Sequence, residues 1–382
     1  MHSIEEHMKI NLPEFNECVL CGRCLQVCPL FGAENREELS PRAKGLFLRD
    51  LVRRESMPRK AERLAGLCLS CGRCKKACPR DLDMPEIISR VKSATPSWQK
   101  FVWQKANKSL PVLLPFMSRA ENAKCLPETA RPYVRAVSRP RPEPFLNAVP
   151  DNALEGTTCV LFPGCLATYS WTWLEETAAT LLGNRGAEIR TRPDWSCCGY
   201  SLFSAGARDA ARKCMQKNIA LWNDLGRPRI ITFCATCHQG LKLVRNPGPE
   251  EDTKIYSAFL NSIDYMPDLM HGARVEASGP SPERIFWHLP CHAPDTEFSL
   301  RASMKTVKNE VHPGRDACCG LGGSMLLEDK NSCLKVNANF WNQAGAASAE
   351  AVITECSGCV LQLEATKPGD KTVYHWLEIF SG

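Results

Sequence analysis

The residues most able to do chemistry in this chain are its cysteines, which number 22 among 382 residues. Eight of them form two copies of one run, Cys-x2-Cys-x2-Cys-x3-Cys-Pro, at an offset of 50 residues. The first copy is Cys18, Cys21, Cys24 and Cys28, and the second is Cys68, Cys71, Cys74 and Cys78. Cysteines this dense and this regular exceed what packing requires, so we expect metal ligands.

The order of these cysteines favours iron–sulfur clusters over zinc. The run is that of bacterial ferredoxins, in which the fourth cysteine ligates the other of two clusters. We therefore predict one [4Fe–4S] cubane at Cys18, Cys21, Cys24 and Cys78, and a second at Cys68, Cys71, Cys74 and Cys28. Structural zinc needs only four ligands per ion and leaves the doubled run with its trailing prolines unexplained.

Ten further cysteines form a second, longer repeat. Each copy has one cysteine, then a Cys-Cys-Gly triplet, then a Cys-x2-Cys pair. The first five-cysteine set is Cys165, Cys197, Cys198, Cys234 and Cys237, and the second five-cysteine set is Cys291, Cys318, Cys319, Cys356 and Cys359. Each set offers one more thiolate than a cubane or a zinc ion takes.

Four cysteines lie outside both repeats: Cys125, Cys159, Cys214 and Cys333. Cys159 lies within an apolar run and Cys214 on an apolar helix face, so we expect both to be buried small hydrophobic residues. Several tryptophans are likewise expected in the core rather than stacked on a cofactor, namely Trp171, Trp173, Trp195 and Trp222.

Apolar runs predict the strands that position the second repeat. Residues 158–162 and 284–289 lead into a cysteine, and residues 229–233 and 351–354 lead into each Cys-x2-Cys pair. Between them, apolar residues recur at helical spacing: Trp171, Leu174, Ala178, Leu181 and Leu182, and further on Ala210, Cys214, Leu221 and Leu225. Strands alternating with helices predict βαβ units with parallel sheets, and the cysteines lie in or beside the loops at the carboxyl ends of the strands.

The N-terminal third reads as short helices around the ferredoxin run. Ser40 as a cap and Pro41 in the first turn predict a helix over residues 41–52, and residues 84–91 predict another. Residues 111–150 contain eight prolines, a density that predicts extended backbone rather than regular helix.

Composition and charge narrow the function classes. The 48 basic and 42 acidic residues give a net charge of +6, and cluster-bound thiolates would offset much of it. No segment interleaves basic and aromatic residues, so we expect no nucleic-acid partner. The first ten residues do not resemble a secretory signal, and the longest apolar stretch, residues 110–117, is too short to cross a bilayer. We expect a cytoplasmic protein with free thiols, held at most at the cytoplasmic face of the membrane through a partner.

The second repeat resembles the cysteine-rich CCG domain, whose pattern is C-x31–39-CC-x35–36-C-x2-C. That family includes the B and D subunits of heterodisulfide reductase and the iron–sulfur subunits of glycolate oxidase, lactate dehydrogenase and anaerobic glycerol-3-phosphate dehydrogenase. A two-cluster ferredoxin module followed by two CCG domains is most similar to the D subunit of heterodisulfide reductase. One departure is the interval of 26 residues between Cys291 and Cys318, which is shorter than the family's usual first interval.

The resemblance implies a multidomain α/β fold with an α-helical ferredoxin module and two repeated βαβ-type, Rossmann-like CCG domains. The expected bounds are 1–100 for the ferredoxin module, 101–156 for a helical and proline-rich linker, 157–245 for the first CCG domain, 246–284 for a connection and 285–382 for the second CCG domain.

The resemblance also implies a function. Each five-cysteine set would hold a noncubane [4Fe–4S] cluster, electrons would arrive singly from the cubanes, and a disulfide would be reduced or formed between the two sets. We therefore expect the sets to face one another across open space. His292 follows Cys291 and is the candidate proton donor to a leaving thiolate; its alternatives are a hydrogen bond to cluster sulfur or a solvated ring.

A second interpretation stays open, in which the chain only relays electrons. The segment 38–48, with its Ser-Pro-Arg, resembles the subunits associated with flavoprotein dehydrogenases. No G-x-G-x-x-G follows a strand, so we expect neither flavin nor NAD in this chain. Flavin or quinone chemistry would then belong to a flavoprotein, a membrane cytochrome b or a quinone-reactive partner.

Overall fold

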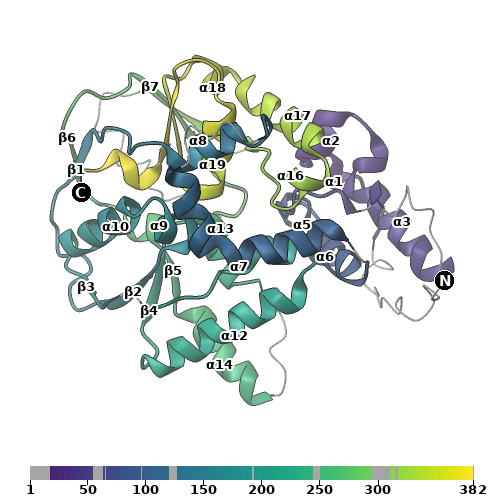
Figure 1. Ribbon diagram of the computed structural model, residues 1–382, viewed down its shortest axis with the longest axis horizontal. Coiled ribbons are helices and arrows are strands. Elements are labelled where there is room, and N and C mark those ends of the chain that lie inside the picture. The colour runs from purple at the N-terminus through teal and green to yellow at the C-terminus, as the bar shows by residue number, and fades with distance from the viewer. Residues whose placement is uncertain are drawn as a thin grey trace. The chain divides into compact units, whose positions relative to one another are not determined.

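The chain forms two compact units in the computed structural model, whose helices and strands are labelled in Figure 1. The described residues are 18–54, 63–64, 66–95, 97–119, 127–191, 193–243, 250–294, 310–314 and 317–381, so Cys125 lies outside them. Unit 1 comprises Met1–Asn107, Ser201–Ala211 and Gly320–Phe340, and unit 2 comprises Lys108–Tyr200, Arg212–Cys319 and Trp341–Gly382. Unit 1 therefore includes two segments that begin next to the Cys-Cys-Gly triplets in the chain, one at Ser201 and the other at Gly320, the glycine of the second triplet.

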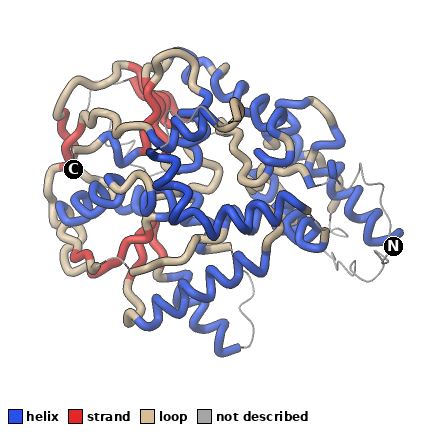
Figure 2. Tube along the Cα trace, in the orientation of Figure 1, coloured by secondary structure: helices blue, strands red, loops and turns tan. Residues whose placement is uncertain are grey.

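Unit 1 is built from helices in its described residues (Figure 2). They include α1 (Arg23–Gln26), α2 (Pro29–Glu34), η3 (Glu37–Leu39), α3 (Pro41–Arg54), α5 (Arg73–Lys76), α6 (Met84–Ala94) and α16 (Met325–Glu328), with most of α17 (Lys330–Trp341). The predicted start of α3 is confirmed, because Pro41 is its first residue and the amide of Ala43 donates to the hydroxyl of Ser40 at 3.1 Å. The predicted helix at residues 84–91 is also present, as α6.

The apolar core of unit 1 lies between α3 and α6. Leu48 packs with a group of buried side chains from α6: Met84, Ile87, Ile88 and Val91. Cys68 and Cys74, from the second ferredoxin-type run, pack against this cluster. The second run therefore lies against the hydrophobic core of its unit.

Unit 2 holds two parallel four-stranded sheets, drawn in red in Figure 2. One has the order β3-β2-β4-β5, from β2 (Thr158–Phe162), β3 (Glu188–Ile189), β4 (Arg229–Thr232) and β5 (Ile263–Tyr265). The other has the order β8-β7-β9-β10, from β7 (Arg284–His288), β8 (Glu310–Gly314), β9 (Ala351–Thr354) and β10 (Thr372–His375). Neighbouring strands are parallel throughout both sheets, as expected for apolar strands alternating with helices.

The remaining elements of unit 2 cover or connect these sheets. They are α8 (Arg131–Ser138), α9 (Gly164–Tyr169), α10 (Trp173–Asn184), α13 (Ala235–Leu241), α14 (Glu250–Asn261), α15 (Met266–Leu269), α18 (Ala344–Ser348), α19 (Ser357–Thr366) and η5 (Trp376–Ile379). A two-stranded antiparallel pair joins β1 (Leu146–Ala148) to β6 (Val275–Ala277). The helices α7 (Trp98–Arg119), α11 (Tyr200–Ser204) and α12 (Arg208–Asp224) each run from one unit into the other along the chain.

The expectation that prolines exclude helix from residues 111–150 was wrong in two places. Helix α7 continues through Pro111 and Pro115, and α8 spans residues 131–138. Pro132 lies in the first turn of α8, where backbone N–H groups make no hydrogen bond within the helix, so the absence of an N–H in proline costs nothing there. Pro111 is exposed, so its ring lies in solvent rather than among packed side chains.

A buried ion pair ties the segment after α8 to the C-terminus. The guanidinium of Arg139 donates to Glu378 at 2.7 and 2.8 Å and lies over the ring of Trp171. The indole of Trp173 also donates to Glu378, at 2.9 Å. This carboxylate is fully buried, so its negative charge depends on these partners.

The predicted helix at residues 210–225 is present as α12, but its buried face is shifted by one position. Ala211, Met215, Asn218 and Trp222 are buried, whereas Ala210, Cys214, Leu221 and Leu225 are only partly so. Cys214 is therefore not the buried residue we expected, because Met215 and Trp222 are larger and Trp222 packs edge-on against Phe259 of α14. Cys159, Trp171 and Trp222 are buried as predicted.

Candidate functional site

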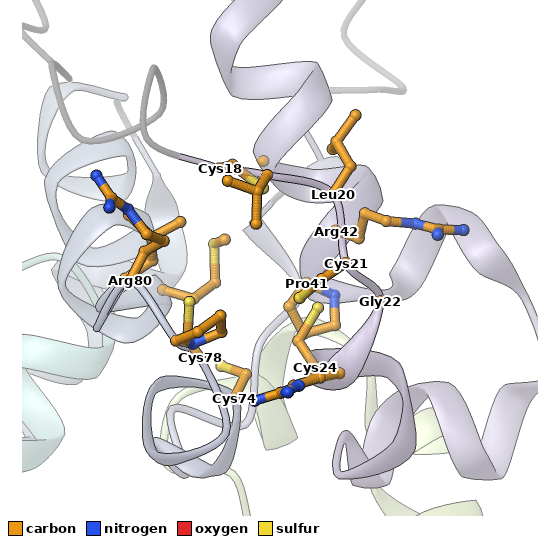
Figure 3. A pocket seen from close by; sticks show the side chains of 16 residues that line it. Cys18, Leu20, Cys21, Gly22, Cys24, Pro41, Arg42, Cys74, Cys78 and Arg80 are labelled. Carbon is orange, nitrogen blue, oxygen red and sulfur yellow. The ribbon is translucent and has the colours of Figure 1, made fainter.

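The first ferredoxin-type run meets the last cysteine of the second run at one pocket of unit 1. Cys18, Cys21, Cys24 and Cys78 all line it, and Cys24 and Cys78 lie on opposite sides of it (Figure 3). Helix α1 begins after Gly22, whose φ of 79° gives the chain the sharp turn that brings three cysteines to one side. Gly72 makes the same turn before α5, with φ of 72°.

A second pocket of unit 1 gathers the other four cysteines. Cys68, Cys71 and Cys74 line it together with Cys28, the last cysteine of the first run. Cys74 also lines the first pocket, so the two pockets adjoin. Each pocket thus contains the four cysteines expected for one cubane, including the fourth cysteine from the opposite run.

Burial dominates the acidity of these thiols. It raises the pKa of Cys24 and of Cys28 above the usual range, and it raises the pKa of Cys74 well above it, with Cys71 as the next cause. Lys44 lowers the pKa of Cys28 in part; its ammonium is buried beside the second pocket and donates to the carbonyl of Leu67. Metal binding would have to displace these protons.

In unit 2, the carboxyl ends of the parallel strands position the cysteines of both five-cysteine sets. Cys165 follows β2 and Cys291 follows β7, each after a short turn containing proline. Cys234 and Cys356 are the residues directly before α13 and α19, which places Cys237 and Cys359 in the first turn of each helix.

The first five-cysteine set is closely packed. Hydrogen bonds from Cys197 and Cys237 hold the pKa of Cys198 well below its usual value, and Cys237 and Cys356 do the same for the pKa of Cys234. Burial raises the pKa of Cys165 to about 12, and Cys198 and Cys234 add to the effect. The five sulfurs therefore form one connected group.

The two sets adjoin one another. The thiol of Cys359 donates a hydrogen bond to the sulfur of Cys319 at 3.1 Å and is also hydrogen-bonded to Cys356. These hydrogen bonds connect three cysteines of the second set. The loops of the two sets also touch, since the amide of Ala235, next to Cys234, donates to the carbonyl of Glu355, next to Cys356, at 2.9 Å. The two sets thus meet at the loops that follow strands β4 and β9. The open space that we expect between the sets remains a prediction.

His292 lies in a chain of hydrogen bonds that joins both sets. Its Nε2 is 2.6 Å from the hydroxyl of Tyr200, and its Nδ1 is 3.2 Å from the hydroxyl of Thr236. The hydroxyl of Thr236 lies 3.1 Å from the sulfur of Cys356. The imidazole is therefore held in place by residues of the first set's loops and is linked to a cysteine of the second.

Two polar residues at this site, Asn218 and Glu355, are not predicted by the sequence motifs. Asn218, on the buried face of α12, accepts from the amide of Ser196 at 2.8 Å and donates to the carbonyl of Cys197 at 3.3 Å. Glu355, directly before Cys356, is buried and accepts from Tyr265 at 2.8 Å and from Trp287 at 3.1 Å. A polar residue at a buried helical position was the signal that could have identified Asn218.

Glycines leave room for two sulfurs of the first set. A side chain at Gly164, whose φ is 77°, would come within 2.5 Å of the sulfur of Cys237. One at Gly240 would come within 2.9 Å of the sulfur of Cys198.

Among the described residues, no group of three or more His, Cys, Asp or Glu side chains has the arrangement of ligands around a single metal ion. Where the structure describes helices, none is both long and apolar enough to cross a membrane.

Sequence profiles of two families match the chain. The one described as a 4Fe-4S dicluster domain matches residues 14–82. The one described as a cysteine-rich domain, CCG, matches twice, over residues 159–242 and 285–364. These matches cover both cysteine repeats.

Several other proteins are similar over nearly the whole chain. The B subunit of fumarate reductase (CoM/CoB) from Methanothermobacter marburgensis is 24% identical over 95% of this chain and 71% of its own length. The D subunit of dihydromethanophenazine:CoB–CoM heterodisulfide reductase from Methanosarcina barkeri is 22% identical over 92% and 88%. The glycolate oxidase iron-sulfur subunit of Escherichia coli is 20% identical over 95% and 92%.

One solved structure has a similar fold. The crystal structure of a hypothetical protein from Helicobacter pylori aligns with a TM-score of 0.54 and 13% identity, over 96% of this chain and 71% of that one.

Proposed function

Because the chain belongs to the family of iron–sulfur proteins that carry the CCG domain, we propose that it is the electron-transferring and catalytic subunit of a multi-subunit oxidoreductase. In this function, the ferredoxin-type cysteines would hold two [4Fe–4S] cubanes and the CCG cysteines noncubane clusters. These clusters would supply, one at a time, the two electrons that reduce a disulfide together with two protons, or would accept them when a disulfide is formed. Its partners would be a flavoprotein, a membrane cytochrome b or a quinone-reactive subunit.

The cysteines fit this set of clusters by number and by donor type. Cys18, Cys21, Cys24 and Cys78 would hold one cubane, and Cys28, Cys68, Cys71 and Cys74 the other, as the linings of the two adjoining pockets support. The two five-cysteine sets would hold the noncubane clusters, and the connected thiols of the first set support that assignment. Such clusters supply one-electron oxidation and reduction when bound.

The single observation that carries the catalytic proposal is that the loops of the two complete five-cysteine sets touch: the amide of Ala235 donates to the carbonyl of Glu355 at 2.9 Å, and the hydroxyl of Thr236 lies 3.1 Å from the sulfur of Cys356. A disulfide has two sulfurs, so cleaving it calls for two acceptors next to one another. A simple relay needs no such pair of complete sets.

His292 would be oriented for this reaction by Tyr200 and Thr236. The two hydroxyls fix the plane of the imidazole, and Thr236 links it to Cys356. A ring held in this way could donate a hydrogen bond or a proton to a leaving thiolate at the junction of the sets. We therefore propose His292 as the donor to the leaving thiolate.

Two relatives support thiol chemistry by name. The fumarate reductase and heterodisulfide reductase subunits both carry CoM and CoB in their names, and each matches more than nine-tenths of this chain. The glycolate oxidase subunit, which matches 95%, favours a second function: an electron relay for a flavoprotein dehydrogenase, with no substrate site of its own.

Iron content and a thiol response test the proposal together. Anaerobically purified protein is expected to contain about sixteen iron atoms, four for each of four clusters. Oxidised protein should then give a new paramagnetic signal on addition of CoM or CoB, and none with the corresponding alcohols. Cubane signals without a thiol response would favour the relay, and protein containing mainly zinc would refute both functions.

The crossed ligands have their own test, read by EPR of the reduced protein. Cys21→Ser and Cys71→Ser each remove a ligand from one run and so assign the signal of each cubane. Cys28→Ser should then change the same signal as Cys71→Ser, because Cys28 is proposed to serve the cluster of the Cys68 run. If it changes the same signal as Cys21→Ser, each run holds its own cluster and the crossing is wrong.

A further inference from the structure

The two ferredoxin-type loops have the same backbone but opposite surroundings. Leu20 and Ser70 occupy matching positions, 50 residues apart, and both have left-handed φ, at 54° and 53°. Yet Leu20 is 43% exposed and its neighbour Val19 is 63% exposed, whereas Ser70 is 5% and Leu69 is 6% exposed. One copy of the loop therefore faces solvent and the other is covered.

What covers the second loop is another segment of the same unit. A side chain at Gly322 would come within 2.6 Å of the Leu69 side chain, so the segment after the second Cys-Cys-Gly triplet lies directly against this loop. The second pocket also borders the apolar core, against which Cys68 and Cys74 pack. The cluster in the second pocket would thus be enclosed within unit 1.

The first pocket has an open and basic rim. Cys21 is the exposed cysteine of its run, and the described residues that line the pocket include three arginines, Arg23, Arg42 and Arg80, and no acidic residue. Arg42 and Arg80 point away from the cysteine sulfurs, as Leu20 does (Figure 3). Arg42 is paired with Glu37, and Arg23 and Arg80 are both exposed.

Exposed apolar residues beside exposed arginines are typical of a docking surface rather than of cluster binding alone. Cations near a cluster can offset its negative charge without any apolar neighbour. An exposed valine and leucine contribute nothing to that effect, and they cost free energy in water unless another surface covers them. The covered second loop shows that the same cysteine spacing does not require such exposure.

We propose that Val19, Leu20, Arg23, Arg42 and Arg80 form the surface on which an acidic one-electron carrier protein docks. One electron crosses between that carrier and the cluster held by Cys18, Cys21, Cys24 and Cys78, so the carrier is oxidised as the cluster is reduced, or the reverse. No bond or proton changes place. The inference rests on the proposed function and adds the point of exchange and the chemistry of the partner.

Binding tests the surface separately from catalysis. The probes are a [2Fe–2S] ferredoxin and a flavodoxin, both with an acidic surface, titrated calorimetrically onto the holoprotein at low salt. The test variant is Leu20→Ser with Arg80→Gln, because Ser70 shows that serine adopts the required backbone in the matching loop. We expect its Kd to rise at least about tenfold and its salt dependence to weaken by about one charge.

A matched control changes the same types of residue elsewhere in unit 1. Val102→Ser with Arg36→Gln removes a side chain that is 40% exposed and an exposed arginine, and it should leave the Kd unchanged. Iron content and EPR of the reduced clusters check that both variants still bind their clusters. If Leu20→Ser disturbs the cluster, Arg80→Gln and Arg23→Gln as single variants measure the surface instead.

Two results would overturn the proposal. One is equal affinity of the test and control variants for the carriers, and the other is failure of both carriers to bind the wild-type holoprotein at low salt. Failure of the proposed function looks different, since it shows as missing cubane signals or a missing thiol response in wild type, whatever the carriers do.

Discussion

Replacing Gly164 with alanine is expected to damage the first five-cysteine set through a single contact. The φ of Gly164 is 77°, and its new side chain would come within 2.5 Å of the sulfur of Cys237. The left-handed backbone costs an alanine about 1–2 kcal/mol. Overpacking adds about 1–3 kcal/mol, because Cys237 is itself held by Cys198 and Cys234 and has little freedom to move.

Gly226 provides the matched control. Its φ is 79°, but a side chain there would meet nothing within 4 Å. Gly226→Ala should therefore cost only the backbone term of about 1–2 kcal/mol, while Gly164→Ala should cost about 2–5 kcal/mol. The difference between the two variants isolates the contact with Cys237.

Anaerobic urea unfolding and iron analysis measure both effects. Gly164→Ala should lower the unfolding midpoint more than Gly226→Ala does, and it should contain about four fewer iron atoms per chain, with the cubane signals intact. Equal midpoints and equal iron contents in the two variants would refute the reasoning, since the contact with Cys237 would then carry no cost.

Three further changes test other parts of the structure. Asn218→Leu leaves the amide of Ser196 and the carbonyl of Cys197 unpaired, so it should lower the free energy of unfolding by about 1–3 kcal/mol for each group and cause loss of iron from unit 2. The control Asn223→Leu, at an exposed position of the same helix, should have neither effect. Arg139→Met should cost about 3–5 kcal/mol in urea unfolding because it leaves Glu378 buried without its cation. Adding Glu378→Gln should recover part of that loss, since the amide carries no charge and its oxygen still accepts from Trp173; an additive double variant would contradict the pairing. Lys44→Met should lower the midpoint potential of the cluster in the second pocket, because it removes a cation that stabilises the reduced cluster. The shift should be on the order of tens of mV in an EPR redox titration, and Lys76→Met, at an exposed lysine, should give a smaller one. Equal shifts would mean that the charge of Lys44 has no special effect on this cluster.

Much of the local structure was predictable because its causes are local. The strands at 158–162 and 351–354 have the predicted bounds, since short apolar runs between turn residues leave few alternatives. The start of α3 followed from a serine cap and a proline in the first turn. The face of α12 was misjudged by one residue, because helical spacing gives the period of an apolar stripe but the size of its neighbours decides which stripe is buried.

The order of the cysteines along the chain was enough to predict which cysteines of unit 1 line each pocket together, because ligand spacing restricts which sulfurs can reach one cluster. It could not predict that the amide of Ala235 donates to the carbonyl of Glu355, because this contact depends on two sheets from distant parts of the chain. Nor could it predict which ferredoxin-type loop faces water. The two loops are nearly identical in spacing and backbone, so their exposure follows from whether a distant segment, such as the one containing Gly322, packs over them.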